Sequence, residues 1–205
     1  MFNRLKRLFS PSNSGEARLC SLLRQYRDEL PSPSARNDHQ KCLSVLASIL
    51  DFGFQGRSPI PNLAAYATDS CLFELACYVL SSTDFWAFNK APDKRQKIQQ
   101  ILFAQLDAIC SRSGFLPAEA AFSFANDRVG MYGRIASQSS GMEGLHLRLN
   151  QALKHATTHS LPPAHIDDVP PIFGDPFEAL GVTKALVRWE MHRLSDMDSI
   201  LCTIS

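Results

Sequence analysis

Residues 71–80 read Cys-Leu-Phe-Glu-Leu-Ala-Cys-Tyr-Val-Leu, and this run decides the fold. Nine of its ten side chains are apolar, and Glu74 carries its only charge. In the segments on both sides, apolar residues recur at spacings of three and four, which is typical of amphipathic helices. The pattern therefore predicts a helix that is apolar on most of its circumference and is enclosed by neighbouring helices.

The chain is predicted to be all-α, because no convincing alternation of apolar and polar residues indicates a β-strand. We expect a single-domain bundle of six to seven helices, with the central apolar helix at about residues 69–82. Residues 1–13 are predicted to be a flexible basic tail, and residues 14–205 the helical domain, with a proline-rich crossing segment at 161–176. The aromatic stretch Phe85–Phe88 is expected to form a loop that seals the core.

The composition is that of a globular protein. Hydrophobic residues make up 45% of the 205 residues and charged residues 20%, close to the usual averages. The formal net charge of +1 leaves no strongly basic surface to neutralise phosphates, so nucleic acid is not an expected partner. The longest apolar run is well short of the roughly 20 residues that cross a bilayer, so we expect no membrane-spanning helix.

The six cysteines predict a reducing compartment. None of them is spaced as Cys-x-x-Cys, and five lie within or beside apolar helical patterns, where cysteine acts as a small hydrophobic residue. The first residues also lack the apolar core of a secretory signal. We therefore expect free thiols and a cytoplasmic location.

Glu74 is the first candidate for chemistry, because burial would raise the pKa of its carboxyl group toward a value useful for proton transfer. A buried acid is more often neutralised by a cation, and Arg128 and Arg134 are the candidates for that role. Together with Tyr132, these three residues could instead line a small ligand pocket. Because the sequence holds no phosphate-binding loop or nucleophile motif, we predict no catalytic residue and no cofactor.

A group of histidines is the second candidate. His155 and His159 are four residues apart, which places two imidazoles on one side of a helix, as a divalent metal requires. His165 and either Asp167 or Asp168 would complete the coordination. The glutamate of the zinc-protease helix is missing between the two histidines, so structural histidines are the competing interpretation. A metal-dependent enzyme or metal sensor is the alternative hypothesis.

The third candidate is a surface on the last predicted helix, residues 183–194. If Val187, Met191 and Leu194 face the core, Trp189 lies on the opposite side of the helix. Tryptophan with a nearby arginine is the composition of binding hot spots. The competing interpretation is that the indole packs under another segment of the chain. The predicted protein interface consists of Trp189, Arg193, His192 and Ala185.

The first nine residues read Met-Phe-Asn-Arg-Leu-Lys-Arg-Leu-Phe and combine apolar with basic side chains. A weak contact with an anionic membrane surface is a further alternative, since basic amphipathic segments bind such surfaces. Nine residues do not form a stable helix alone in water, so a frayed terminus is the competing interpretation. The residues of the expected contact are Phe2, Leu5, Phe9, Arg4, Lys6 and Arg7.

The leading hypothesis is a non-enzymatic cytoplasmic protein-interaction domain of the adaptor, regulator or inhibitor type. Residues with an obvious chemical role are hard to find in this sequence, whereas candidates for exposed aromatic anchors are present. We therefore expect a protein partner and binding rather than catalysis.

Overall fold

A computed structural model describes residues 17–52, 67–137, 141–162, 165 and 176–204, with the backbone alone for residues 118, 141–143 and 176–181. These residues form seven α-helices and two short 3-10 helices and contain no strand, which confirms the predicted all-α bundle. The predicted tail, residues 1–13, and most of the proline-rich segment lie outside the described residues. No described helix combines the length and the apolar character needed to cross a membrane.

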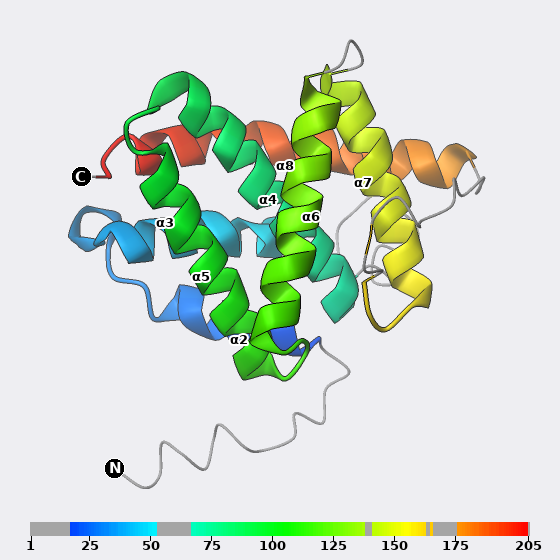
Figure 1. Ribbon diagram of the computed structural model, residues 1–205, viewed down its shortest axis with the longest axis horizontal. Coiled ribbons are helices and arrows are strands. Elements are labelled where there is room, and N and C mark those ends of the chain that lie inside the picture. The colour runs from blue at the N-terminus through cyan, green and yellow to red at the C-terminus, as the bar shows by residue number, and fades with distance from the viewer. Residues whose placement is uncertain (1–16, 53–66, 138–140, 163–164, 166–175, 205) are drawn as a thin grey trace, which may run out of the picture.

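The bundle is arranged around α4, which packs against α2, α3, α5, α6 and α7 (Figure 1). Helix α8 packs on α3 and α7, and antiparallel α5 and α6 lie side by side in front of α4 in the view of Figure 1. The elements are α2 (Arg18–Asp28), η2 (Pro33–Ala35), α3 (Asp38–Ala47), η3 (Ser48–Asp51), α4 (Asp69–Lys90), α5 (Arg95–Ser113), α6 (Ala118–Ala136), α7 (Gly141–Thr158) and α8 (Pro176–Leu201).

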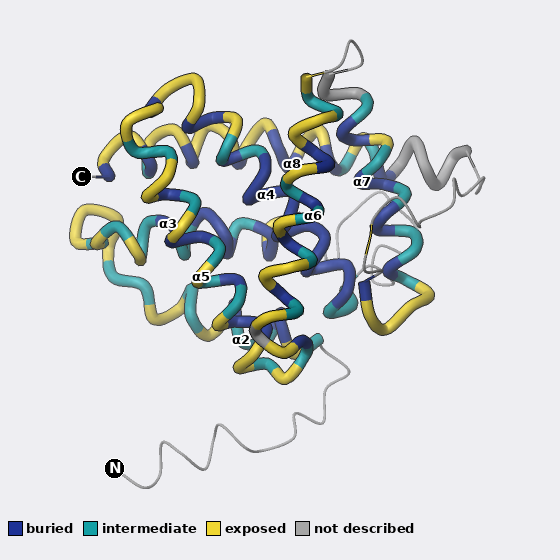
Figure 2. The backbone as a smooth tube through the Cα atoms, viewed as in Figure 1, coloured by how far each residue is buried: buried dark blue, intermediate teal, exposed yellow. Residues whose placement is uncertain are grey.

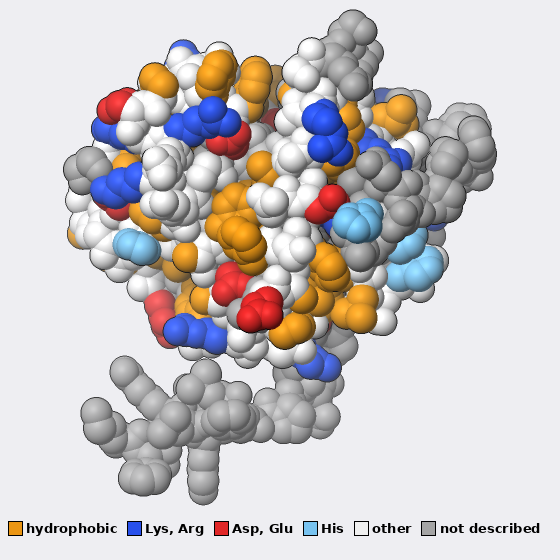
Figure 3. All heavy atoms as spheres, viewed as in Figure 1, with side chains coloured by type: hydrophobic (Ala, Val, Ile, Leu, Met, Phe, Trp, Pro, Cys, Tyr) orange, Lys and Arg blue, Asp and Glu red, His pale blue; other side chains and the backbone are white. Residues whose placement is uncertain are grey.

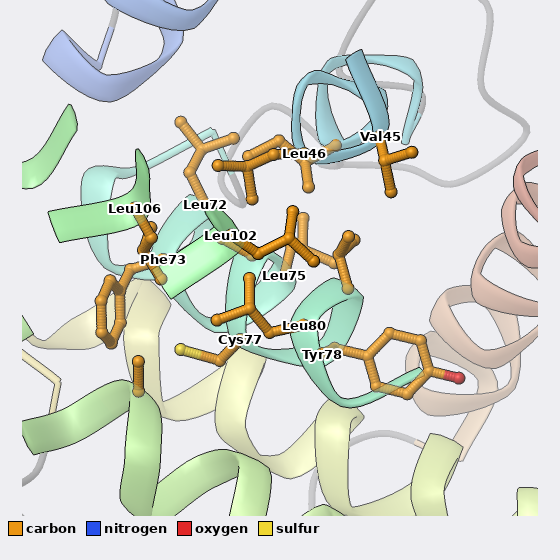
Figure 4. Packing of buried hydrophobic residues seen from close by; sticks show 14 of the residues in the cluster. Val45, Leu46, Leu72, Phe73, Leu75, Cys77, Tyr78, Leu80, Leu102 and Leu106 are labelled. Atoms are coloured by element: carbon orange, nitrogen blue, oxygen red, sulfur yellow. The ribbon is translucent and has the colours of Figure 1, made fainter. Parts of the chain in front are cut away.

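The apolar run does form the centre of the molecule. Every residue from Ser70 to Leu80 is buried, and Figure 2 shows buried backbone gathered in the interior with exposed backbone around it. In Figure 4, Leu46 of α3 lies over α4 from one side, and Leu102 and Leu106 of α5 lie against it from another. Burial on the whole circumference explains why this segment has no polar face.

Helix α4 is longer than predicted, because it continues from about residue 82 to Lys90. The stretch Phe85–Phe88 is therefore helical, and its prediction as a loop is wrong. The indole of Trp86 is buried and donates a hydrogen bond to the carboxylate of Asp198 on α8, 2.9 Å away. This contact ties the last two turns of α4 to α8. Ser81, Ser82 and Thr83 are weak helix formers, so the helix would extend past them less readily without such a tertiary contact.

The connection between α5 and α6 begins at Gly114, whose φ of +68° lies in the left-handed region that favours glycine. A guanidinium nitrogen of Arg18 lies 3.6 Å from the position that a Cβ would take at Gly114. The start of α2 is therefore beside the α5–α6 turn.

Candidate functional site

A buried ion pair joins α4 to α6. The side chains of Glu74 and Arg128 are 1% and 0% exposed, and their closest atoms, Oε1 and Nη2, are 3.1 Å apart. The Nε of Arg128 donates to the same carboxylate at 3.3 Å, and its Nη1 lies 3.2 Å from Asp127. The guanidinium also lies 5.8 Å from the centre of the Phe124 ring. Arg128 is thus the cation that neutralises the buried acid.

Burial dominates the electrostatics of this pair. Burial raises the pKa of Glu74, and the attraction of Arg128 only partly offsets this effect. Burial also lowers the pKa of Arg128, but there the attraction of Glu74 outweighs it, so that this pKa lies above its usual value. Because neither side chain reaches solvent, the pair links two helices and offers no access to a substrate.

The predicted pocket of four residues is not gathered in one place. Tyr132 is fully buried near Glu74 and Arg128, whereas Arg134 is exposed on the outer side of α6. The ring of Tyr132 packs edge-on against the ring of Tyr78, with 5.7 Å between their centres. The hydroxyl of Tyr132 is buried and has no hydrogen-bond partner among the described residues.

A second buried cluster, centred on Glu190, joins α8 to α4 and α7. The Oε2 of Glu190 accepts a hydrogen bond from the hydroxyl of Tyr78 at 2.6 Å and lies 2.6 Å from the Nε2 of His146. Its Oε1 accepts from Arg193 at 3.3 Å, and Arg193 also donates to the hydroxyl of Ser82 at 2.7 Å. Figure 4 shows the Tyr78 hydroxyl pointing away from the apolar cluster, toward α8.

Hydrogen bonding decides the charge state of Glu190. Burial alone would raise the pKa of this carboxyl group, but the hydrogen bonds from His146 and Tyr78 and the charge of Arg193 outweigh it and lower the pKa. Burial also raises the pKa of Tyr78, and the negative charge of Glu190 raises it further, so the phenol stays protonated and keeps donating. The cluster therefore holds a carboxylate in place with three donors.

The two tyrosines make a matched test of these contacts. Tyr132→Phe should leave the free energy of unfolding unchanged or raise it by up to about 1 kcal/mol, because it removes a buried hydroxyl that has no partner. Tyr78→Phe should lower it by about 1.5–3 kcal/mol, because the buried carboxylate of Glu190 loses a donor. Urea unfolding of the two variants measures both changes, and equal losses would contradict this assignment.

The lowered pKa of Glu190 predicts a pH dependence. A carboxyl group whose pKa is lower in the folded state than its usual value of 4.5 stabilises the fold fully above that pH. This stability is lost as the pH falls through the folded pKa. In Glu190→Gln the contribution is absent, so the stability difference between wild type and variant should shrink as the pH falls below about 4.5. Urea midpoints across this range test it, and a constant difference would contradict it.

The predicted interface on the last helix is turned inward. Trp189 is 5% exposed, its Nε1 donates to the carbonyl of Ser48 at 2.9 Å, and its ring packs edge-on against Phe52 at 5.5 Å. Arg193 is also buried, with its guanidinium 5.2 Å from the Trp189 ring. The prediction that these two residues face outward is wrong. Of the other two residues of that group, Ala185 is half-buried and His192 is exposed.

The opposite side of α8 faces solvent instead. Val187, Met191 and Leu194 are 40%, 70% and 37% exposed. The pattern of apolar residues misplaced this face because it assigned the charged Arg193 to the surface together with Trp189. Arg193 and the neighbouring Glu190 enter the core because partners on α4 and α7 satisfy their charges.

The histidines do not gather around a common point. The rings of His155 and His159 stack at 3.8 Å, and His165 lies 3.5 Å from a carboxylate oxygen of Asp127. Burial lowers the pKa of His155, and the neighbouring His159 lowers it further. Within the described parts of the chain, no three histidine, cysteine or acidic side chains are placed to hold a metal ion. Asp167 and Asp168 lie outside the described residues.

A groove between α5 and α6 was not predicted from the sequence. It has a volume of about 650 Å³, and apolar atoms dominate its lining. Figure 3 shows hydrophobic side chains gathered between these two helices, with acidic side chains beside them. The lining residues are Gln96, Gln99, Gln100, Phe103, Ala104, Asp107, Glu119 and Phe122.

Two phenylalanines form the apolar floor and wall of this groove. Phe103 of α5 is half-buried, and Phe122 of α6 is 54% exposed, with 5.5 Å between their ring centres. Phe122 follows the spacing of three and four that is typical of a buried helix face, yet its ring lies open to solvent. The signal that could have found the groove is the apolar face of α5, which is too wide for one neighbouring helix.

The buried clusters thus connect helices, and the open apolar groove lies apart from them on the outer side of α5 and α6. A closed, fully paired cluster serves packing, whereas an open apolar surface is available to another molecule. Comparisons of this chain with protein-family models, with curated proteins and with solved structures found no match.

Proposed function

We propose that this protein is a non-catalytic helical binding domain that holds an amphipathic helix of a partner protein in the α5–α6 groove. The observation that carries the proposal is the exposed Phe122 beside Phe103 in a groove of about 650 Å³. A monomeric protein rarely leaves a large aromatic side chain more than half exposed next to an apolar hollow unless that hollow receives something.

The shape and chemistry of the groove favour a helix as its ligand. Two antiparallel helices leave a long furrow between them, and an amphipathic helix fills such a furrow with apolar side chains one turn apart. The apolar centre is bordered by glutamines, which can bond to the polar flank of a ligand at little cost in desolvation: Gln96, Gln99 and Gln100. The acidic side chains at one end, Asp107 and Glu119, favour a ligand that carries basic residues.

The interior of the protein supports binding rather than catalysis. Burial raises the pKa of the thiols of Cys42, Cys71 and Cys110 to about 12, so they carry almost no thiolate at neutral pH. The two buried acids, Glu74 and Glu190, are held by arginine and out of reach of a substrate. None of the six cysteines, all of which lie in described residues, forms a disulfide, which supports the cytoplasmic location that is part of this proposal.

The experiment uses a fluorescent model helix of leucine and lysine, with leucines along one face, titrated with the full-length protein. We expect saturable binding, weakened about tenfold or more by Phe122→Glu, which puts a charge into the apolar centre. Val187→Glu on α8 is the matched control, because it adds the same charge to an exposed apolar surface elsewhere and should change nothing. Equal weakening by both variants, or no saturable binding, would refute the groove as a binding site.

A further inference from the structure

The amphipathic segment at the beginning of this chain has the chemistry that the α5–α6 groove requires. Phe2, Leu5 and Phe9 recur at spacings of three and four, so in a helix they form one apolar face about two turns long. The rings of Phe2 and Phe9 could pack against the phenylalanine pair Phe103–Phe122 at the centre of the groove, since aromatic rings pack well against one another. The remaining face of such a helix carries the basic residues Arg4, Lys6 and Arg7.

The charges of segment and groove are opposite. The lining of the groove includes the carboxylates of Asp107 and Glu119 and no lysine or arginine. The segment contains three basic residues and no acidic residue among its first nine. Residues 10–205 have a formal net charge of only −2, and the two carboxylates of the groove lie beside its apolar centre, so this pairing is a local complementarity.

The segment can also reach the groove. The guanidinium of Arg18, at the start of α2, reaches to 3.6 Å from the position of a Cβ at Gly114 in the α5–α6 turn. Along α5, Asp107 is seven residues from Gly114, a helical distance of about 10 Å. The seven residues 10–16 can span up to roughly 23 Å when extended. The tether is therefore long enough to place residues 2–9 over the lining residues.

We infer that residues 2–9 occupy the α5–α6 groove as a ligand built into the chain, which a partner helix must displace. This inference rests on the proposed function, because it takes the groove as a binding site for a basic amphipathic helix. A short tether gives an effective concentration in the millimolar range, so a segment too short to bind well in trans still fills the groove in cis. The first residues thereby set the affinity threshold that a partner has to exceed.

The first experiment compares full-length wild type with the full-length variant Phe2→Ser, Leu5→Ser, Phe9→Ser, using the same leucine–lysine helix as probe. Loss of the built-in competitor should tighten binding of the probe about tenfold. Leu147→Ser, which removes an exposed leucine from α7, is the matched control and should leave the affinity unchanged. Equal affinity of triple variant and wild type would overturn the inference while leaving the proposed function intact. Absence of probe binding to every variant would overturn both.

The second experiment observes the segment directly and needs no probe helix. A spin label is attached at Ser10→Cys in a chain whose exposed Cys202 is replaced by serine. We expect the label to broaden the methyl resonance of Ala104 in the groove and to leave that of Leu147 on α7 sharp. Broadening that appears only outside the groove, or that is unchanged by Phe122→Glu, would overturn the inference. So would the absence of any Ala104 broadening together with binding of the segment to anionic vesicles, since the segment would then serve a lipid surface.

Discussion

Replacing Arg128 with methionine will lower the free energy of unfolding by about 3–5 kcal/mol. The substitution keeps much of the side-chain volume but leaves the carboxyl group of Glu74 buried, 1% exposed, without its cation. Glu74 must then either remain charged in an apolar surrounding or take up a proton, and both cost free energy. Urea unfolding of the full-length protein at neutral pH measures the loss.

A double-mutant cycle separates this cost from lost packing. Glu74→Met combined with Arg128→Met removes both charges, so most of the stability lost in the single variant should return. The pair Asp84–Arg95 is the matched surface control, because its side chains are 22% and 43% exposed and 2.7 Å apart. Asp84→Asn should cost less than about 1 kcal/mol, since solvent screens that pair. A double variant that is no more stable than Arg128→Met would contradict the buried-charge explanation.

Replacing Phe73 with alanine will lower the free energy of unfolding by a similar amount, about 3–5 kcal/mol. Phe73 is 0% exposed on the central helix, and its ring lies 6.1 Å from that of Phe115. The substitution removes most of a buried ring from a site enclosed by other helices, so the cavity cannot collapse fully. Chemical denaturation of the variant, with an unchanged slope against urea, is the measurement.

The control for this prediction is the groove phenylalanine. Phe122→Ala should cost less than about 1 kcal/mol, because that ring is 54% exposed and its removal opens no enclosed cavity. If Phe122→Ala were as costly as Phe73→Ala, the groove would be part of the core and not a surface for a ligand. A small effect also qualifies Phe122 for binding studies, since changes in affinity can then not be attributed to unfolding.

The buried clusters and the α5–α6 groove lie in different parts of the molecule. The pairs Glu74–Arg128 and Tyr78–Glu190 fix α6 and α8 to α4 from inside, across 54 and 112 residues of sequence. The Glu74–Arg128 pair holds α6 from its inner side, and the outer side of α6 takes no part in that contact. A rigid wall with an uncovered apolar side is the arrangement that a helix-binding groove requires.

Local features of the molecule could be predicted from residue patterns. The run 71–80 predicted its own burial, because nine apolar side chains in ten leave no polar face for solvent. The lone acid in that run predicted a buried counter-charge, because an unpaired carboxylate is too costly to bury. Neither inference needed the position of any other helix.

The orientation of α8, the length of α4 and the exposure of Phe122 could not be predicted in this way. Glu190 enters the core because Tyr78 and His146, 112 and 44 residues away in sequence, supply hydrogen-bond donors to its carboxylate. A periodicity argument ranks each side chain by its own polarity and so turned α8 the wrong way. Sequence alone thus determined which helix is central, and it named Arg128 and Arg134 as candidate partners of the acid without choosing between them. Only the tertiary structure decided which polar groups are buried and which apolar ones stay open, because both depend on partners that the fold brings together.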